Sequence, residues 1–130
     1  MGIISTRLTA STTLGANSNI PVGSVIHKNC TKLFANGNSW TVKGVGYFKA
    51  SANVTVAPTT AGDITVTMYD NGTAVATASG VTATNGDAVT LPLQYVGLNE
   101  CACCNHTITL DVSVASTVTE SSMIIQRGEL

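Results

Sequence analysis

The chain has 130 residues, of which 10% are charged and 44% are hydrophobic, and its net charge at neutral pH is −1. This composition excludes general disorder, and it offers no basic surface for nucleic acid or for an anionic membrane. No stretch approaches the roughly 18 apolar residues that a membrane-spanning helix requires. The length predicts one domain over residues 1–130, synthesised in a cytoplasm without export.

The first 24 residues predict a strand followed by a loop. Ile4, Thr6 and Leu8 alternate with their neighbours in the period of two that is typical of a strand. Residues 11–18 are rich in Ser, Thr, Asn and Gly, which favour a loop. Residues 24–34 predict a further short strand.

The longest predicted strand covers residues 45–56 and follows a turn at Asn36-Gly37-Asn38. One of its faces is apolar throughout, with the residues Phe48, Ala50, Ala52, Val54 and Val56. The other face is mostly polar. This pattern predicts a strand with one buried face.

The clearest element is a hairpin over residues 63–79. Ile64, Val66 and Met68 alternate with polar or aromatic neighbours, and a second run of small residues returns after the turn. Asn71-Gly72 tolerates the positive φ angles that a tight reversal needs.

The remaining chain predicts three more strands, over residues 88–96, 106–116 and 122–127, with a turn at residues 119–121. Pro92 confines the first of them to a sheet edge or a bulge, because proline lacks an N–H for the ladder. The chain as a whole predicts eight to ten short antiparallel strands and no helical period, and therefore an all-β sandwich or barrel.

The order of these elements resembles the jelly rolls of the tumour necrosis factor and complement globular-head type, especially the small bacterial and phage versions. The resemblance covers residues 40–127, about two thirds of the chain. It is carried by Gly46-Tyr47 through Val56, the Tyr69-Asp70-Asn71-Gly72 hairpin, the strand from His106 to Val114, and Ser121-Ser122-Met123-Ile124-Ile125. The fold class that it implies is a jelly-roll β-sandwich.

The resemblance also implies a compact homotrimer that acts as a structural or adhesive module. A head of this size without a collagen-like stalk is similar to a phage capsid decoration or head-fibre protein, made in the cytoplasm of a bacterial host. Its expected location is the virion, and its expected partner is the major capsid protein or another virion protein. Residues 1–24 are then the expected attachment strand and loop.

Four apolar residues are candidates for a shared trimer seam: Tyr47, Phe48, Met123 and Ile125. A small jelly roll that shares such a seam buries more surface than it can bury alone. The alternative is that all four lie in the core of the single chain.

The alternative function is a glycan- or receptor-binding tip module on a phage or spore surface. Such a module needs aromatic and amide side chains at exposed loop tips. Trp40 with Asn36 and Asn38 is the one stretch with that composition, and a host surface glycan would be its ligand.

Cysteines and histidines provide the only sign of special chemistry. His27 precedes Cys30 by three positions, and Cys101, Cys103, Cys104 and His106 follow about seventy residues later. Thiolates and imidazoles are ligands that zinc prefers, although this spacing matches no standard finger or ribbon. Three states stay open: a zinc site, one or two disulfides with Cys30 joined to the later group, or reduced thiols.

No enzyme motif is present. A cysteine–histidine nucleophile requires an oriented base and a pocket, and here its parts would come from one Asn-rich loop. The prediction is therefore a protein without catalytic residues and with no cofactor other than the candidate zinc.

Overall fold

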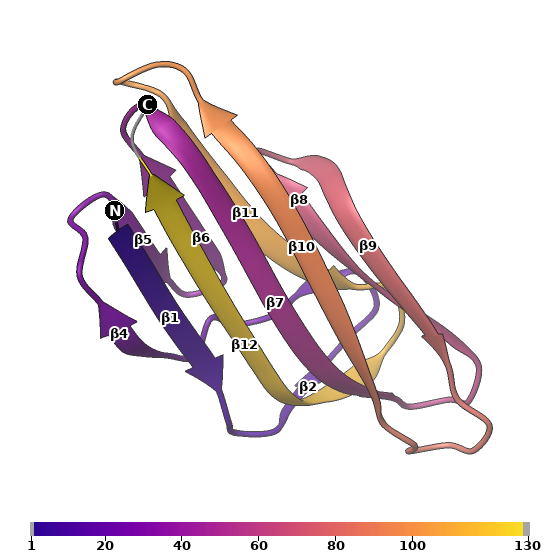
Figure 1. Ribbon diagram of the computed structural model, residues 1–130. Helices are drawn as coiled ribbons and strands as arrows, with labels where there is room; N and C mark the ends of the chain where they lie inside the picture. The colour runs from indigo at the N-terminus through magenta and orange to yellow at the C-terminus, as the bar shows by residue number, and fades with distance from the viewer. Residues whose placement is uncertain (1, 129–130) are drawn as a thin grey trace.

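The computed structural model describes residues 2–128, which form two antiparallel sheets packed face to face (Figure 1). In chain order the strands are β1 (Gly2–Leu8), β2 (Thr12–Leu14), β3 (Ser18–Asn19), β4 (Ser24–Lys28), β5 (Leu33–Asn36), β6 (Ser39–Lys43), β7 (Gly46–Pro58), β8 (Asp63–Asp70), β9 (Thr73–Val81), β10 (Val89–Asn99), β11 (Asn105–Val112) and β12 (Ser116–Gly128). Within the described residues, no helix has the length and apolar character needed to cross a membrane.

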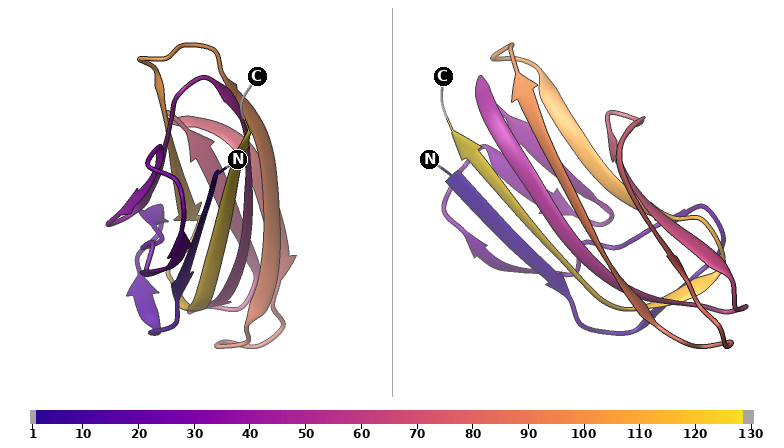
Figure 2. Two further views of the ribbon diagram at one scale, coloured as in Figure 1. Left: turned by 60° about the vertical axis from the view of Figure 1, so that its left-hand side comes forward. Right: turned by 45° about the vertical axis from the view of Figure 1, so that its right-hand side comes forward.

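Sheet 1 has the strand order β10-β7-β12-β1-β4, with β2 added to β12, and sheet 2 has the order β5-β6-β11-β8-β9, with β3 added to β11. Sequence neighbours often lie in different sheets, so the chain crosses repeatedly between the two layers, as Figure 2 shows from two further sides. The start of β1 and the end of β12 lie side by side, because Gly2 pairs with Arg127.

The core fills the space between the sheets and follows the alternation of the longest strands. In β7 every second residue from Phe48 to Val56 is at most 2% exposed. Ile64, Val66 and Met68 of β8 meet them from sheet 2 and are fully buried. The β8–β9 turn has φ angles of 52° at Asn71 and 84° at Gly72, the left-handed region that the Asn-Gly pair was expected to adopt.

The predicted fold class, an all-β jelly-roll sandwich, is confirmed, whereas the number of strands differs. The described residues contain twelve strands rather than eight to ten. Two of the additional strands, β2 and β3, are only three and two residues long. Residues 24–34, expected to form one strand, include β4 and the start of β5, which belong to different sheets.

The turn predicted at residues 119–121 is wrong. β12 runs without interruption from Ser116 to Gly128 beside β7, and its register shifts between Val118 and Glu120. The extra residue forms a β-bulge, and the Thr119 hydroxyl donates to the Thr55 carbonyl at 3.3 Å. Because of the bulge, the strand continues through polar residues that are otherwise typical of a turn.

The N-terminal strand lies inside sheet 1, between β12 and β4. Ile4, Thr6 and Leu8 point into the core, as their alternation predicts. The predicted domain (1–130) and attachment segment (1–24) both start at Met1, which lies outside the described residues, as do residues 129–130. Because β1 pairs with β12 and β4, it is a part of the sandwich. Within residues 1–24, the segment that contains β2 and β3 is the one that stays a candidate for attachment.

Candidate functional site

The side of sheet 1 that faces away from the core, here called outer face 1, is formed by alternate residues of β10, β7, β12 and β1. The register places Val96, Lys49, Gln126 and Ile3 in one row across these strands. Large apolar side chains are exposed on this face: Tyr47 is 53%, Val96 64% and Ile124 41% exposed. These exposed apolar side chains make outer face 1 the candidate contact surface of the chain.

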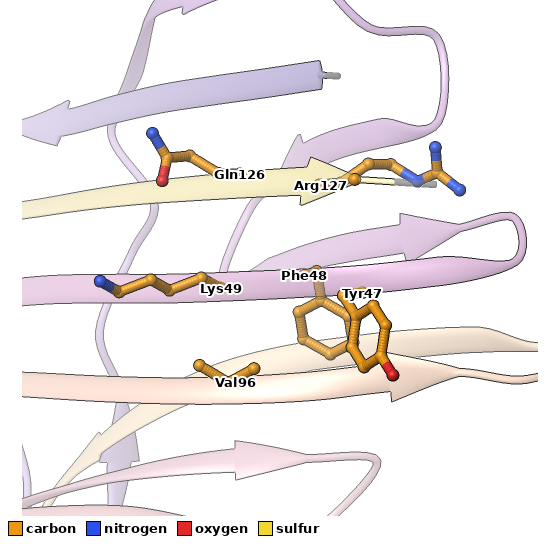
Figure 3. Close-up of a pocket in the computed structure, with 7 residues that line it drawn as sticks. Tyr47, Phe48, Lys49, Val96, Gln126 and Arg127 are labelled. Carbon is orange, nitrogen blue, oxygen red and sulfur yellow. The ribbon is translucent and has the colours of Figure 1, made fainter. Parts of the chain in front are cut away.

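A shallow pocket of about 280 Å³ opens on outer face 1 where β7 begins and where β10 and β12 end (Figure 3). Tyr47 and Val96 border it on one side, and the stem of Lys49 and Gln126 on the other. The Phe48 ring lies beneath it, against Gly97, where an added Cβ would overlap the ring. Glycine at this position therefore lets Phe48 fill the space below the pocket.

A second hollow on outer face 1, of about 310 Å³, lies between β4, β1 and β12. Ile26 and Ile124 line it, together with Ser5 and Ser122. Ile26 is 64% exposed and occupies the irregular position where the β1–β4 register shifts. Arg7 and Glu120, which also line the hollow, form an ion pair, so they contribute little net charge to this surface.

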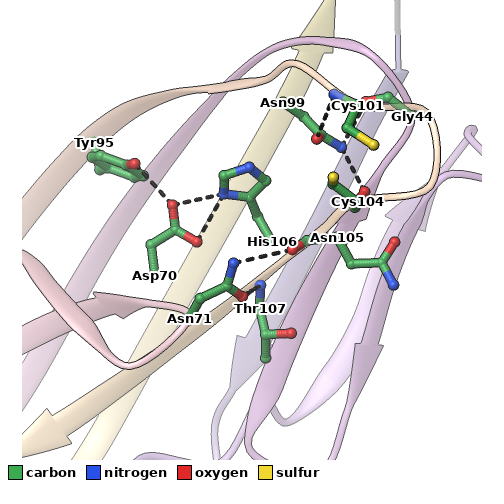
Figure 4. A network of polar contacts seen from close by, with 10 residues as sticks. All are labelled: Gly44, Asp70, Asn71, Tyr95, Asn99, Cys101, Cys104, Asn105, His106 and Thr107. Carbon is green, nitrogen blue, oxygen red and sulfur yellow. Dashed lines mark hydrogen bonds and ion pairs between the residues drawn. The ribbon is translucent and has the colours of Figure 1, made fainter.

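A buried polar network joins the two sheets near the cysteine loop (Figure 4). Asp70 at the end of β8 is only 8% exposed. Its carboxylate accepts a hydrogen bond from the Tyr95 hydroxyl of β10 at 2.8 Å, and His106 Nδ1 lies 2.8 and 2.9 Å from its two oxygens. Burial, followed by the hydrogen bond to Asp70 and its charge, raises the pKa of Tyr95 to about 12. The network links β10 of sheet 1 to β8 and β11 of sheet 2.

The loop between β10 and β11 brings three thiols together. The sulfur atoms of Cys101, Cys103 and Cys104 all lie within 4.8 Å of one another, and those of Cys101 and Cys103 are 3.0 Å apart. Hydrogen bonds from the Cys104 and Cys103 side chains lower the pKa of the Cys101 thiol to about 7. The hydrogen bond with Cys101 raises the pKa of Cys104 to about 11.

The predicted trimer seam is only partly accessible. Phe48, Met123 and Ile125 are 2%, 1% and 0% exposed and belong to the core of the single chain, so their assignment to a seam is wrong. Tyr47 alone is exposed and lies on outer face 1. For these three residues the structure shows the alternative, burial in the core of the single chain.

The predicted glycan contact at Trp40 is also wrong. Trp40 is 1% exposed, and its indole N–H donates to the Thr6 hydroxyl across the core at 3.0 Å. Asn36 and Asn38 are exposed at the β5–β6 turn, but the buried Trp40 ring cannot serve as their aromatic platform. The stretch therefore lacks the stacking surface that the glycan-binding alternative requires.

The six residues predicted to form a metal or disulfide site separate into different places. His27 is exposed on β4, and Cys30 packs against the core from the loop before β5. His106 is held by Asp70, so it does not join the thiols. All four cysteines are unbridged, and Cys30 is not part of the three-thiol cluster.

Sequence reasoning missed Val96, Ile124 and Ile26 as exposed apolar residues. A signal for two of them was present. Val96 is out of phase with the buried Leu91 and Leu93, and Ile124 lies between the buried Met123 and Ile125. No comparable signal marks Ile26, because its orientation depends on the register shift between β1 and β4.

Comparison with solved structures shows the fold. The chain is similar to murine APRIL at pH 5.0, with a TM-score of 0.74 and 10% identity over 96% of this chain and 98% of that one. For the globular domain of zebrafish complement 1qA the TM-score is 0.75 and the identity is 5%, over 98% of this chain and 100% of that one. For the PRD1 vertex protein P5 the TM-score is 0.64 and the identity is 10%, over 99% of this chain and 97% of that one. No family model and no curated protein sequence matches the chain.

The sandwich is therefore a tumour necrosis factor and complement type jelly roll, the fold that the sequence resemblance implied. The low identities mean that the likeness concerns the fold alone.

Proposed function

We propose that the chain is a non-catalytic structural virion protein that assembles as a homotrimer and decorates, or projects from, a phage capsid. Two lines of support concern the same jelly-roll fold. The fold is similar to that of the phage PRD1 vertex protein P5, and the sequence resembles small phage jelly rolls that are compact trimers.

The observation that carries the proposal is the apolar character of outer face 1. Tyr47, Val96 and Ile124 expose large side chains on one sheet face of a chain in which only 10% of residues are charged. A second and third copy of this chain are the occupants that we assign to this face. Removing these side chains from water would stabilise the trimer by about 25 cal/mol for each Å² of apolar surface buried.

The geometry of the face suits a contact between copies. The two hollows, one beside Tyr47 and one beside Ile124, lie on the same sheet and can receive protruding side chains of a neighbour. Lys49 and Arg127 are the cations that line the first hollow, and Arg127 is 4% exposed and donates to the backbone carbonyls of Lys43 and Val45. The Arg7–Glu120 pair neutralises the second hollow. Like-charge repulsion between copies is therefore small.

Attachment to a capsid would use surfaces that the trimer leaves free. The segment with β2 and β3 lies on the outside of the sandwich, and its exposed residues are mostly Ser, Thr, Asn and Gly. Such residues form hydrogen-bonded contacts with a partner such as the major capsid protein.

Immunogold labelling tests the virion role. A tag on this chain is introduced into the phage genome that encodes it, and purified particles are labelled. The proposal expects label on the capsid, in a fixed amount per particle that is retained after a density gradient. Particles that are complete and unlabelled, with the tagged protein left in the lysate, would contradict it.

A further inference from the structure

We propose that the loop between β10 and β11 is a binding site for one thiophilic metal ion, with Cys101, Cys103 and Cys104 as its three protein ligands. This site differs from the mixed histidine and cysteine set that the sequence predicts. It is independent of the assembly proposed above, because none of its residues lies on outer face 1.

The distances between the sulfur atoms fit a single ion. Sulfur ligands at the usual zinc–sulfur distance of about 2.3 Å lie about 3.8 Å apart in a tetrahedral site. The three sulfur atoms here all lie within 4.8 Å of one another. Small rotations of the side chains would therefore bring them to coordination distance, without movement of the backbone.

The backbone of the loop is held in this shape before any ion binds. The Cys104 N–H donates to the Cys101 carbonyl at 3.1 Å, which closes a turn around the cluster. Asn99, which is fully buried, donates from Nδ2 to the carbonyls of Cys104 at 2.8 Å and Gly44 at 3.0 Å (Figure 4). One buried amide thus anchors the turn to the β6–β7 connection. A preformed turn reduces the ordering that an ion would otherwise require.

The ligand set determines the class of ion. Thiolates are soft donors that favour Zn²⁺ and Cu⁺ over Mg²⁺ or Ca²⁺. Binding forms three metal–sulfur bonds and releases each thiol proton still present to solvent, with no change in oxidation state. Cys103 and Cys104 are exposed and Cys101 is partly exposed, so an ion can enter directly from solvent, and a water molecule can complete a tetrahedral zinc site.

Metal binding by the reduced full-length chain tests the site. Zn²⁺ is titrated in the presence of a chromophoric chelator, and Co²⁺ serves as a spectroscopic probe of thiolate coordination. We expect one ion per chain and a sulfur-to-cobalt charge-transfer band. Cys101→Ser and Cys103→Ser should each weaken Zn²⁺ binding at least about tenfold, because each removes a ligand.

Cys30→Ser is the matched control, since Cys30 lies outside the cluster. It should leave both the stoichiometry and the cobalt spectrum unchanged. Circular dichroism of each variant shows whether it is folded. Two results would overturn the proposal: no charge-transfer band in the folded wild-type protein, or Zn²⁺ binding that Cys101→Ser and Cys103→Ser leave unchanged.

Discussion

The outward sides of the two sheets differ in composition, although both inward sides are mainly apolar. Outer face 1 exposes Tyr47, Val96 and Ile124. The outward side of sheet 2, here called outer face 2, carries threonines on its neighbouring strands: Thr41, Thr65, Thr67, Thr107 and Thr109. Its exposed large apolar residues, Phe34 at 38% and Val81 at 72%, lie on its two edge strands, β5 and β9. One hydroxyl pair, Thr65 with Ser79 at 2.9 Å, crosses from β8 to β9.

This difference shows which sheet is suited to a permanent partner. Threonine favours strands through its branched Cβ and remains compatible with water through its hydroxyl. A sheet face built from threonine is therefore stable while it is exposed. Large apolar side chains gain from burial only when a partner covers them. The comparison supports the proposed assembly through outer face 1, whereas the threonine-rich centre of outer face 2 is suited to contact with solvent.

The largest expected effect comes from a charge at the centre of outer face 1. Ile124→Lys should convert the trimer to single chains, because each interface would then bury an uncompensated ammonium at a cost of several kcal/mol. Sedimentation equilibrium measures the change. Thr77→Lys on β9, an exposed position of sheet 2, is the matched control and should remain trimeric. A trimer that survives Ile124→Lys would remove the distinction between the two faces.

A smaller effect is expected from Gly97→Ala, beneath the first pocket. The added Cβ would overlap the Phe48 ring, so the core would have to shift at a cost of about 1–3 kcal/mol. Chemical denaturation measures the free energy of unfolding. Gly128→Ala is the control, since a Cβ there meets no atom, and its effect should stay within about 0.5 kcal/mol. Equal stabilities of the two variants would show that the Phe48 ring does not pack against Gly97.

The hydroxyl of Tyr95 links sheet 1 to sheet 2 and should produce an alkaline transition. The pKa of Tyr95 is raised from 10.0 to about 12 in the folded chain. Its contribution to stability is therefore complete below pH 10 and is lost as the pH rises toward 12. Tyr95→Phe should lower stability at neutral pH by about 1 kcal/mol.

The melting temperature between pH 8 and pH 12 provides the readout. The Tyr95→Phe protein should lose less stability across this range than the wild type does. Tyr69→Phe, at a tyrosine on outer face 2, is the control and should retain the wild-type profile. If the wild type and Tyr95→Phe lost stability equally over this pH range, the hydrogen bond between Tyr95 and Asp70 would not be the cause of the alkaline transition.

The smallest effect is expected on outer face 2 itself. Oδ1 of Asp111 is buried without a hydrogen-bond partner, and burial raises the pKa of this carboxyl above its ordinary 3.8. The folded state therefore favours the protonated form, and stability falls as the pH rises past 3.8. Asp111→Asn should be slightly more stable than the wild type at pH 7 and equal to it near pH 3, as melting curves at the two pH values would show. A loss of stability at pH 7 would contradict this account.

The alternation of residues in the sequence predicted most of the fold, because the inward residues of β7, β8 and β11 follow it without exception. Alternation groups residues onto one face but does not say which face turns inward. Met123 and Ile125 were therefore correctly paired but wrongly assigned to a seam. The answer is determined by how sheet 1, in which β12 pairs with β1 and β7, packs against sheet 2.

The misassigned site residues depended on contacts between distant parts of the chain. Trp40 is adjacent to a polar turn in the sequence. In the fold it points into the core, where its indole N–H donates to the hydroxyl of Thr6, 34 positions away in the other sheet. His106 is close in sequence to the cysteines, but Asp70, which precedes it by 36 positions, holds its ring. The grouping of Cys101, Cys103 and Cys104 was predictable, because one short turn holds all three.

The native mass of the purified wild-type chain tests the central claim, assembly through outer face 1, most directly. The account predicts a single species with three times the chain mass of 13.3 kDa, stable on dilution to submicromolar concentration. A species with the mass of one chain at all concentrations would contradict it. Outer face 1 would then be exposed in the isolated protein, and its apolar residues would need a different partner.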